Sequence, residues 1–260
     1  MRIESGELQI PFAMLLRFGL VLCRTTGLLT FLPLPGLRMG FDVHRLVLAV
    51  LFAVLVLPWS GEAPVVTSIG GIAKVAMSEA ALGVGLGLCV ALMQEGIQLG
   101  AHMIGLQAGF SYASTIDPTS NADSAIVQVL LSLGSAMLFL ALGLDTVLFR
   151  FLLAGVQAVP PGQWTVTPQH VSAVMALFPP LFGDAIRCAL PVVAILLVID
   201  AALALLSRIQ PQLQLLSLSF PLKMLASMVL LALGTPMLPG AVERAAVRSL
   251  EAVQILMAAR

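Results

Sequence analysis

The sequence predicts an all-α integral membrane protein built of long, glycine-patched helical hairpins. Of its 260 residues, 59% are hydrophobic and 10% are charged, whereas a soluble domain is typically about 25% charged. Its mean hydropathy is +1.04. Apolar blocks long enough for membrane-crossing helices alternate with breaks rich in proline and glycine. Because so few polar groups cannot cover the surface in water, we expect lipid or a larger assembly to cover it.

Charge and residue spacing argue against several function classes. The net charge is zero, which argues against nucleic acid as a partner. The three cysteines and three histidines are widely separated, with no spacing typical of a disulfide or a zinc site. No nucleophile–base pair is apparent either. We therefore expect no metal, no cofactor and no enzymatic activity.

The first two apolar blocks predict a helical hairpin. The block at 11–32 is too long for the core of a signal peptide and contains Arg17 and Arg24, so we expect it to be retained. A proline- and glycine-rich break at 33–36 follows. The second block, 46–57, ends at a proline.

The next stretch, 72–107, predicts a helix too long for one straight span. At 1.5 Å per residue it would extend roughly 50 Å, against a hydrocarbon core of about 30 Å. It either breaks near 94–96 or projects beyond the bilayer into protein neighbours. Small residues on one helix face let a second helix approach closely. Five glycines are predicted to pack in this way: Gly83, Gly87, Gly96, Gly100 and Gly105.

The polar segment 109–121 follows this helix, and the rest of the chain is organised around it. Asp117-Pro118 ends the helical pattern, because the residue before a proline is disfavoured in the α region. A closely packed helix thus delivers a segment of small residues to one place, and an ordinary surface turn is one interpretation of it.

The second half of the chain predicts another hairpin and a tail. A further overlong apolar stretch covers 125–159 and ends at a Pro-Pro-Gly turn, which closes a first region of residues 1–162. A connector, 163–183, contains a short amphipathic piece. The hairpin at 184–239 turns at 210–212, and we expect the tail, 240–260, to be an exposed amphipathic helix.

Several polar side chains, Asp145 and Arg150 among them, lie within or near the apolar blocks, and five are assigned to buried or subunit contacts. Such groups are unfavourable in lipid, so they are expected to face protein or water. They serve either as a proton or ion path or as ion pairs between helices and subunits. Asp184 and Arg187, three apart, are expected to pair locally. The five side chains are Glu79, Glu95, His102, Asp200 and Lys223.

The distribution of arginines leaves the topology open. Arg38, Arg45 and the arginines of the tail indicate cytoplasmic loops, whereas the acidic segment 109–121 indicates the opposite side. A conventional single crossing by 72–107 does not satisfy both.

Several motifs, taken in order, carry a resemblance to a known family. Gly105-Leu-Gln-Ala-Gly-Phe-Ser-Tyr-Ala-Ser-Thr-Ile-Asp-Pro118 is followed by a long apolar helix and by Val159-Pro-Pro-Gly162. Arg24-Thr-Thr-Gly27 precedes them, and Ser219-Phe-Pro-Leu-Lys223 comes later. In this order the motifs resemble the FliR family of flagellar biosynthetic proteins. The injectisome counterpart is a close relative.

The resemblance implies a subunit of the type III export gate in the bacterial inner membrane. One copy of the chain would join FliP-type and FliQ-type subunits and other export-apparatus components in a pore for unfolded protein substrates. Its first region would be FliP-like and its hairpin FliQ-like. A secondary transporter with Glu95, His102 and Asp200 as its site is the alternative, but no hydropathy repeat relates 1–130 to 131–260.

The resemblance also implies that the segment after the long helix plugs the closed pore. Its bulky groups, Phe110, Tyr112 and Ile116, are expected at the constriction. The residues assigned to the plug are Gly109, Phe110, Ser111, Tyr112, Ala113, Ser114, Thr115, Ile116, Asp117 and Pro118.

Overall fold

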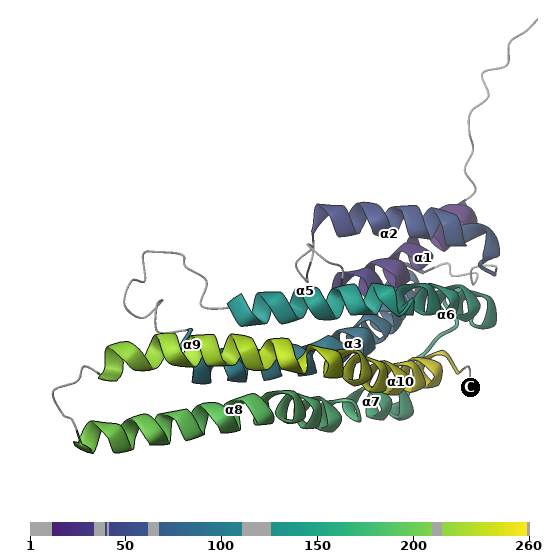
Figure 1. Ribbon diagram of the computed structural model, residues 1–260. Helices are drawn as coiled ribbons and strands as arrows, with labels where there is room; N and C mark the ends of the chain where they lie inside the picture. Colours follow the sequence, from purple (N-terminus) through teal and green to yellow (C-terminus); the bar gives the residue numbers. More distant parts are fainter. Residues whose placement is uncertain are drawn as a thin grey trace, which may run out of the picture.

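The protein is an elongated bundle of long helices lying side by side (Figure 1). The computed structural model describes residues 12–33, 40, 42–61, 68–110, 126–209 and 215–258, and all regular structure in these ranges is helical. Four stretches are long and apolar enough to cross a membrane, or five if one bent pair is counted as a span. The predicted class, an all-α integral membrane protein, is confirmed.

Helices α1 (Phe12–Phe31) and α2 (Val43–Val56) form the first hairpin, and a short 3-10 helix, η1 (Leu57–Trp59), follows them. Arg45 of α2 is buried and donates hydrogen bonds to the carbonyls of Leu29, Thr30 and Leu32 at the end of α1. These carbonyls have no partner within their own helix. Arg45 is therefore an internal cap, which removes its value as a marker of a cytoplasmic loop.

Helix α3 (Ile69–Ala108) runs 40 residues without interruption. The Ser68 side chain caps its start by accepting from the Gly71 N–H at 3.1 Å. The break considered near 94–96 is absent, since no proline falls inside the helix and its glycines are all accommodated in α geometry. At about 60 Å, α3 exceeds the hydrocarbon thickness and has to tilt strongly or extend beyond it.

The second overlong stretch, by contrast, is broken. Helices α5 (Ile126–Ala141) and α6 (Leu144–Ala158) meet at a bend of 61°. Gly143, with φ of +66°, lies at the bend, in a conformation that side chains with a Cβ rarely adopt. The sequence-based interpretation of one continuous apolar stretch overlooked this glycine.

Helices α7 (Pro168–Met175), α8 (Phe178–Ile209) and α9 (Leu215–Gly234) follow. The pair Pro179-Pro180 lies in the first turn of α8, where proline's missing N–H needs no partner. Thus α8 begins within the predicted connector rather than at residue 184. Only 17% of the most apolar window of 168–209 is buried, and 11% of that of 219–257. Much of the apolar hairpin surface is therefore left uncovered by this chain.

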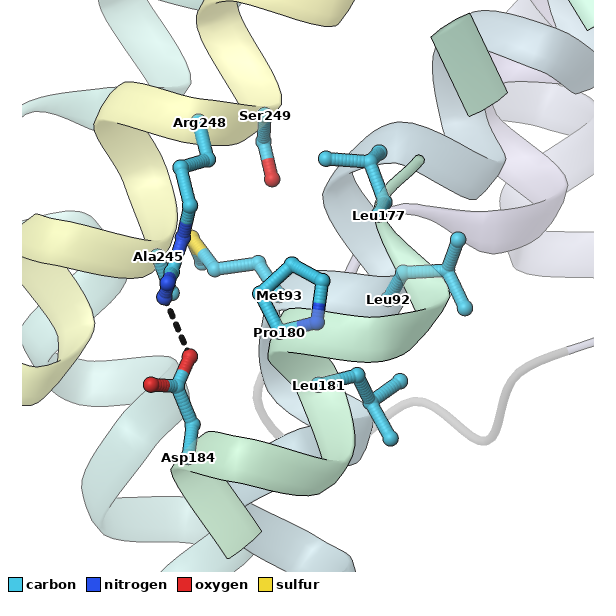
Figure 2. Close-up of a pocket in the computed structure, with 9 residues that line it drawn as sticks. All are labelled: Leu92, Met93, Leu177, Pro180, Leu181, Asp184, Ala245, Arg248 and Ser249. Carbon is cyan, nitrogen blue, oxygen red and sulfur yellow. Dashed lines mark hydrogen bonds and ion pairs between the residues drawn. The ribbon is translucent and has the colours of Figure 1, made fainter. Parts of the chain in front are cut away.

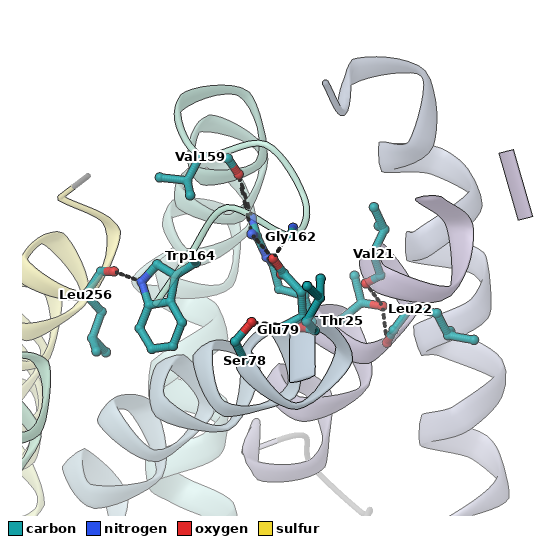
Figure 3. Close-up of polar contacts among 11 residues, drawn as sticks. Val21, Leu22, Thr25, Ser78, Glu79, Val159, Gly162, Trp164 and Leu256 are labelled. Atoms are coloured by element: carbon teal, nitrogen blue, oxygen red, sulfur yellow. Dashed lines mark hydrogen bonds and ion pairs between the residues drawn. The ribbon is translucent and has the colours of Figure 1, made fainter. Parts of the chain in front are cut away.

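The last helix, α10 (Leu238–Met257), follows the short 3-10 helix η2 (Thr235–Met237). The prediction of an exposed tail is wrong for one face, because Val242, Val253 and Leu256 are at most 2% exposed and join the main core with α1 and α3. Alanines at the same face allow close approach. The Trp164 indole N–H donates to the Leu256 carbonyl at 3.0 Å and anchors the end of α10 (Figure 3).

Candidate functional site

The site of interest lies where α3 ends and the 109–121 segment begins. The Phe110 N–H donates to the Gly105 carbonyl at 3.1 Å and the Gly109 N–H to the Leu106 carbonyl at 3.2 Å. This is the Schellman pattern, which requires a left-handed residue, here Gly109 at φ +84°. A Cβ on Gly109 would lie 2.7 Å from the Phe220 ring. Two independent constraints thus select glycine here.

Phe110 is 8% exposed. It belongs to a core cluster with Ala108 of α3 and with Val192 and Leu196 of α8. In this chain it therefore anchors the start of the segment in a hydrophobic core. The other residues assigned to the plug, Ser111 to Pro118, lie outside the described residues.

A polar cluster links the last turn of α3 to the hairpin. Lys223 of α9 pairs with Asp200 of α8, with Nζ 3.0 Å from Oδ1. The Gln107 amide of α3 donates to the Asp200 Oδ2 at 2.9 Å. Helices α3, α8 and α9 thus meet at Asp200. The α3 member, Gln107, lies two residues before Gly109 in the chain. Asp200 and Lys223 are satisfied within the chain, as ion pairing between helices predicts.

Glu79 of α3 is fully buried at the centre of a second polar cluster (Figure 3). The Arg24 guanidinium of α1 makes a bidentate contact with this carboxylate. Its Nε donates to Oε2 at 2.6 Å and its Nη2 donates to Oε1 at 3.1 Å. The Gly162 N–H donates to Oε1 at 2.7 Å, and Arg24 also donates to the Val159 carbonyl at 3.4 Å. One buried pair therefore joins α1, α3 and the turn after α6.

The side chain of Arg24 is only 2% exposed, but Arg24 was not among the polar residues predicted to be buried. An arginine in the middle of an apolar block was the available signal. Its side chain is long enough to satisfy a carboxylate and a carbonyl on two other segments.

Asp184 pairs with Arg248 of α10, not with its local neighbour Arg187 (Figure 2). The pair borders a cavity of about 20 Å³ between α3, α8 and α10, which is room for roughly one water molecule. Helix α10 is thereby tied to α8 by an ion pair. The local prediction failed because a partner on another helix was in reach.

Glu95 and His102 behave differently from the other three predicted polar residues. Both are exposed on α3, and within the described part of the chain neither has a hydrogen-bond or ion-pair partner. Asp200 is held by Lys223 instead. No hydrogen bond or ion pair among the described residues therefore joins the three residues of the alternative transporter site. In the same ranges, no three His, Cys, Asp or Glu side chains gather as metal ligands would.

Four of the five selected glycines lie at close helix contacts. An added Cβ would lie 2.2 Å from the Arg24 carbonyl oxygen at Gly83 and 2.8 Å from that of Leu28 at Gly87, both on α1. At Gly96 and Gly100 it would lie 3.1 and 2.9 Å from carbonyl oxygens of α8. At Gly105 no described atom outside its own helix's nearby backbone lies within 4 Å.

Comparison with known proteins assigns the chain to a family. The model for bacterial export proteins, family 1, matches residues 15–248. Flagellar biosynthetic protein FliR of Bacillus subtilis is 28% identical over 82% of this chain and 84% of its own length. The protein of that name from Pectobacterium carotovorum is 26% identical over 83% of each chain, and that from Aquifex aeolicus is 21% identical over 83% of each. Because the family model covers nearly the whole chain, this protein belongs to the bacterial export proteins, family 1.

Proposed function

We propose that this chain is a non-enzymatic membrane subunit of the flagellar type III protein export apparatus, in the bacterial inner membrane. The observation that carries the proposal is the family match over residues 15–248, together with relatives named flagellar biosynthetic protein FliR. Those names favour the flagellar role over the injectisome role. In this proposal one copy of the chain joins FliP-type and FliQ-type subunits in the export gate.

The uncovered apolar hairpin supports a role inside a larger assembly. Large hydrophobic side chains such as Val198, Leu205 and Val229 are more than half exposed on α8 and α9. A patch of this kind marks a lipid or protein contact. The FliQ-like hairpin is proposed to dock sideways on copies of a similar two-helix subunit.

Co-purification tests this role. The tagged chain is extracted from native membranes in mild detergent, and its partners are identified by mass. Recovery of FliP-type and FliQ-type subunits in constant ratio, with one copy of this chain, is the expected result. A chain that is recovered alone, or only with copies of itself, overturns the proposal.

The segment 109–121 is proposed to close the pore at rest. Gly109 and Phe110 hold its start, through the Schellman contacts and the core cluster. In this proposal Phe110 is the anchor, and Tyr112 and Ile116 fill the lumen and exclude water and ions. The alternative is a connecting turn without a gating role.

Membrane conductance distinguishes these two roles. The variants are a deletion of Ser111 to Thr115, which spares Phe110, and the double substitution Tyr112→Ala, Ile116→Ala. If the segment is a plug, both variants raise the ion leak while the complex still forms. Asn121→Ala, at the far end of the segment, is the control. Unchanged conductance in an assembled deletion complex contradicts the plug.

A further inference from the structure

The outward side of the C-terminal half of α3 combines charge with apolar groups. Glu95, Leu99, His102 and Leu106 follow one another at intervals of four, three and four, so they share one helix face. Glu95 and His102 are exposed, Leu106 is 54% exposed and Leu99 is half-buried. We call these four residues the α3 outer face. The inward side carries Gly96 and Gly100 against α8.

This face differs from the surfaces suited to lipid. The exposed residues of α2 from position 46 onward are all apolar, and such a surface can face hydrocarbon directly. A carboxylate in an apolar span is unfavourable there unless it meets protein or water. The purely apolar α2 face consists of Leu46, Val47, Val50, Leu51, Val54 and Leu55.

Three carboxylates on helices meet cations of other helices, whereas Asp145, Glu243 and Glu251 have no such partner among the described residues. Glu79 meets Arg24 at 2.6 Å, Asp200 meets Lys223 at 3.0 Å, and Asp184 meets Arg248. Glu95 has no such partner among the described residues. Lys74, on the same helix, is about 30 Å away along the axis. A cation for Glu95 is thus to be sought outside the described chain.

We infer that the α3 outer face is an interface with a helix of another membrane protein that carries a lysine or arginine opposite Glu95. The acidic charge selects the basic partner, and Leu99 and Leu106 provide apolar contact on either side of His102. The inference rests on the proposed function only in that it requires a complex to exist. It names the chemistry of the partner, which that proposal leaves open.

The first test uses a photo-crosslinker in place of Leu99, with the rest of the chain unchanged, in the native complex. We expect an adduct with another protein, mapped by mass to a helix with Lys or Arg one turn or less from the crosslink. The same crosslinker at Leu51 of α2 is the control, expected to give lipid adducts. A lipid adduct at Leu99 overturns the inference, and so does labelling of Leu99→Cys by a water-soluble thiol reagent without any protein adduct.

The second test is a charge exchange. Glu95→Lys is expected to lower the yield of complex about tenfold or more, because like charges oppose each other across an interface. Glu95→Gln is expected to lower it less, and Glu251→Lys on the exposed side of α10 not at all. The crosslink identifies the partner's basic residue. Replacing that residue with Glu is expected to restore the yield of complex formed with the Glu95→Lys variant.

Failure of this inference is separable from failure of the proposed function. A complex that forms normally with Glu95→Lys, or that the exchange does not restore, overturns the interface and leaves the export role intact. A wild-type chain without any partner overturns both.

Discussion

Among the described ion pairs, the one between Arg24 and Glu79 is the most deeply buried, with side chains 2% and 0% exposed. Removing one partner of such a pair leaves an uncompensated charge inside the protein, which costs roughly 3–5 kcal/mol. We expect Arg24→Ala to lower the melting temperature of the chain in detergent strongly. Arg150→Ala, at an exposed arginine on α6, is the matched control and should change it little.

The double variant Arg24→Met, Glu79→Leu separates charge from packing. Replacing a buried pair with apolar groups of similar size is often close to neutral. We therefore expect it to recover much of the lost stability, though not all, because the Gly162 N–H loses its acceptor. A double variant no more stable than Arg24→Ala would contradict this account.

A second residue-scale prediction concerns two glycines of α3, five positions apart. Gly100→Leu should force α3 and α8 apart, because a Cβ would lie 2.9 Å from the Ala185 carbonyl oxygen. At Gly105 an added Cβ has no described neighbour within 4 Å, so Gly105→Leu should disturb the fold less than Gly100→Leu. Limited proteolysis of both variants in detergent measures the difference. If Gly105→Leu leaves the chain itself folded but prevents assembly of the complex, Gly105 packs against a partner chain.

At the scale of elements, α10 belongs to the core. Leu256 is 2% exposed and lies in the main core cluster, whereas Ile255 beside it is 36% exposed. Truncating a buried leucine to alanine costs about 2–5 kcal/mol. We expect Leu256→Ala to lower the midpoint of thermal unfolding clearly and Ile255→Ala to lower it less. Equal effects would mean that α10 is not held by this face.

The Asp200 cluster is a second element-scale contact, since it joins α3, α8 and α9. Lys223→Ala leaves Asp200, whose side chain is 38% exposed, with the Gln107 amide as its remaining described partner. We expect a modest loss of stability, since water reaches the carboxylate. Hydrogen exchange should rise at the last turn of α3 more than at its first turn. A uniform rise along α3 would argue against a local link.

At the scale of the whole molecule, the apolar surface left on α8 and α9 has to be covered by lipid or by other subunits, and the proposed export role assigns part of it to subunits. We expect the chain to be degraded or aggregated when produced by itself, and to reach several-fold higher levels when FliP-type and FliQ-type partners are produced with it. Blotting of membrane fractions measures this. A monodisperse chain, stable in detergent without partners, would contradict it.

Much of the fold could be predicted from composition and from the positions of prolines that end helices. Low charge and long apolar blocks predicted a helical membrane protein, and prolines near positions 33, 58 and 160 marked the ends of helices or turns. These signals are local, because a proline or a run of apolar residues acts wherever the chain goes. Gly143 shows the limit of such signals, since its left-handed conformation bends the 126–158 stretch although one glycine in an apolar run is usually tolerated.

Composition and residue type were enough to predict the membrane class, the approximate helices and most of the polar residues that lipid could not accept, although Arg24 was not among them. Their partners depend on how the helices pack: Glu79 pairs with Arg24, Asp184 pairs with Arg248 rather than Arg187, and Glu95 has no described partner. That packing also decided that α10 is half-buried. The physical reason is that unfavourable burial of a charge is a property of the residue, whereas its compensation depends on which helix packing brings within about 3 Å.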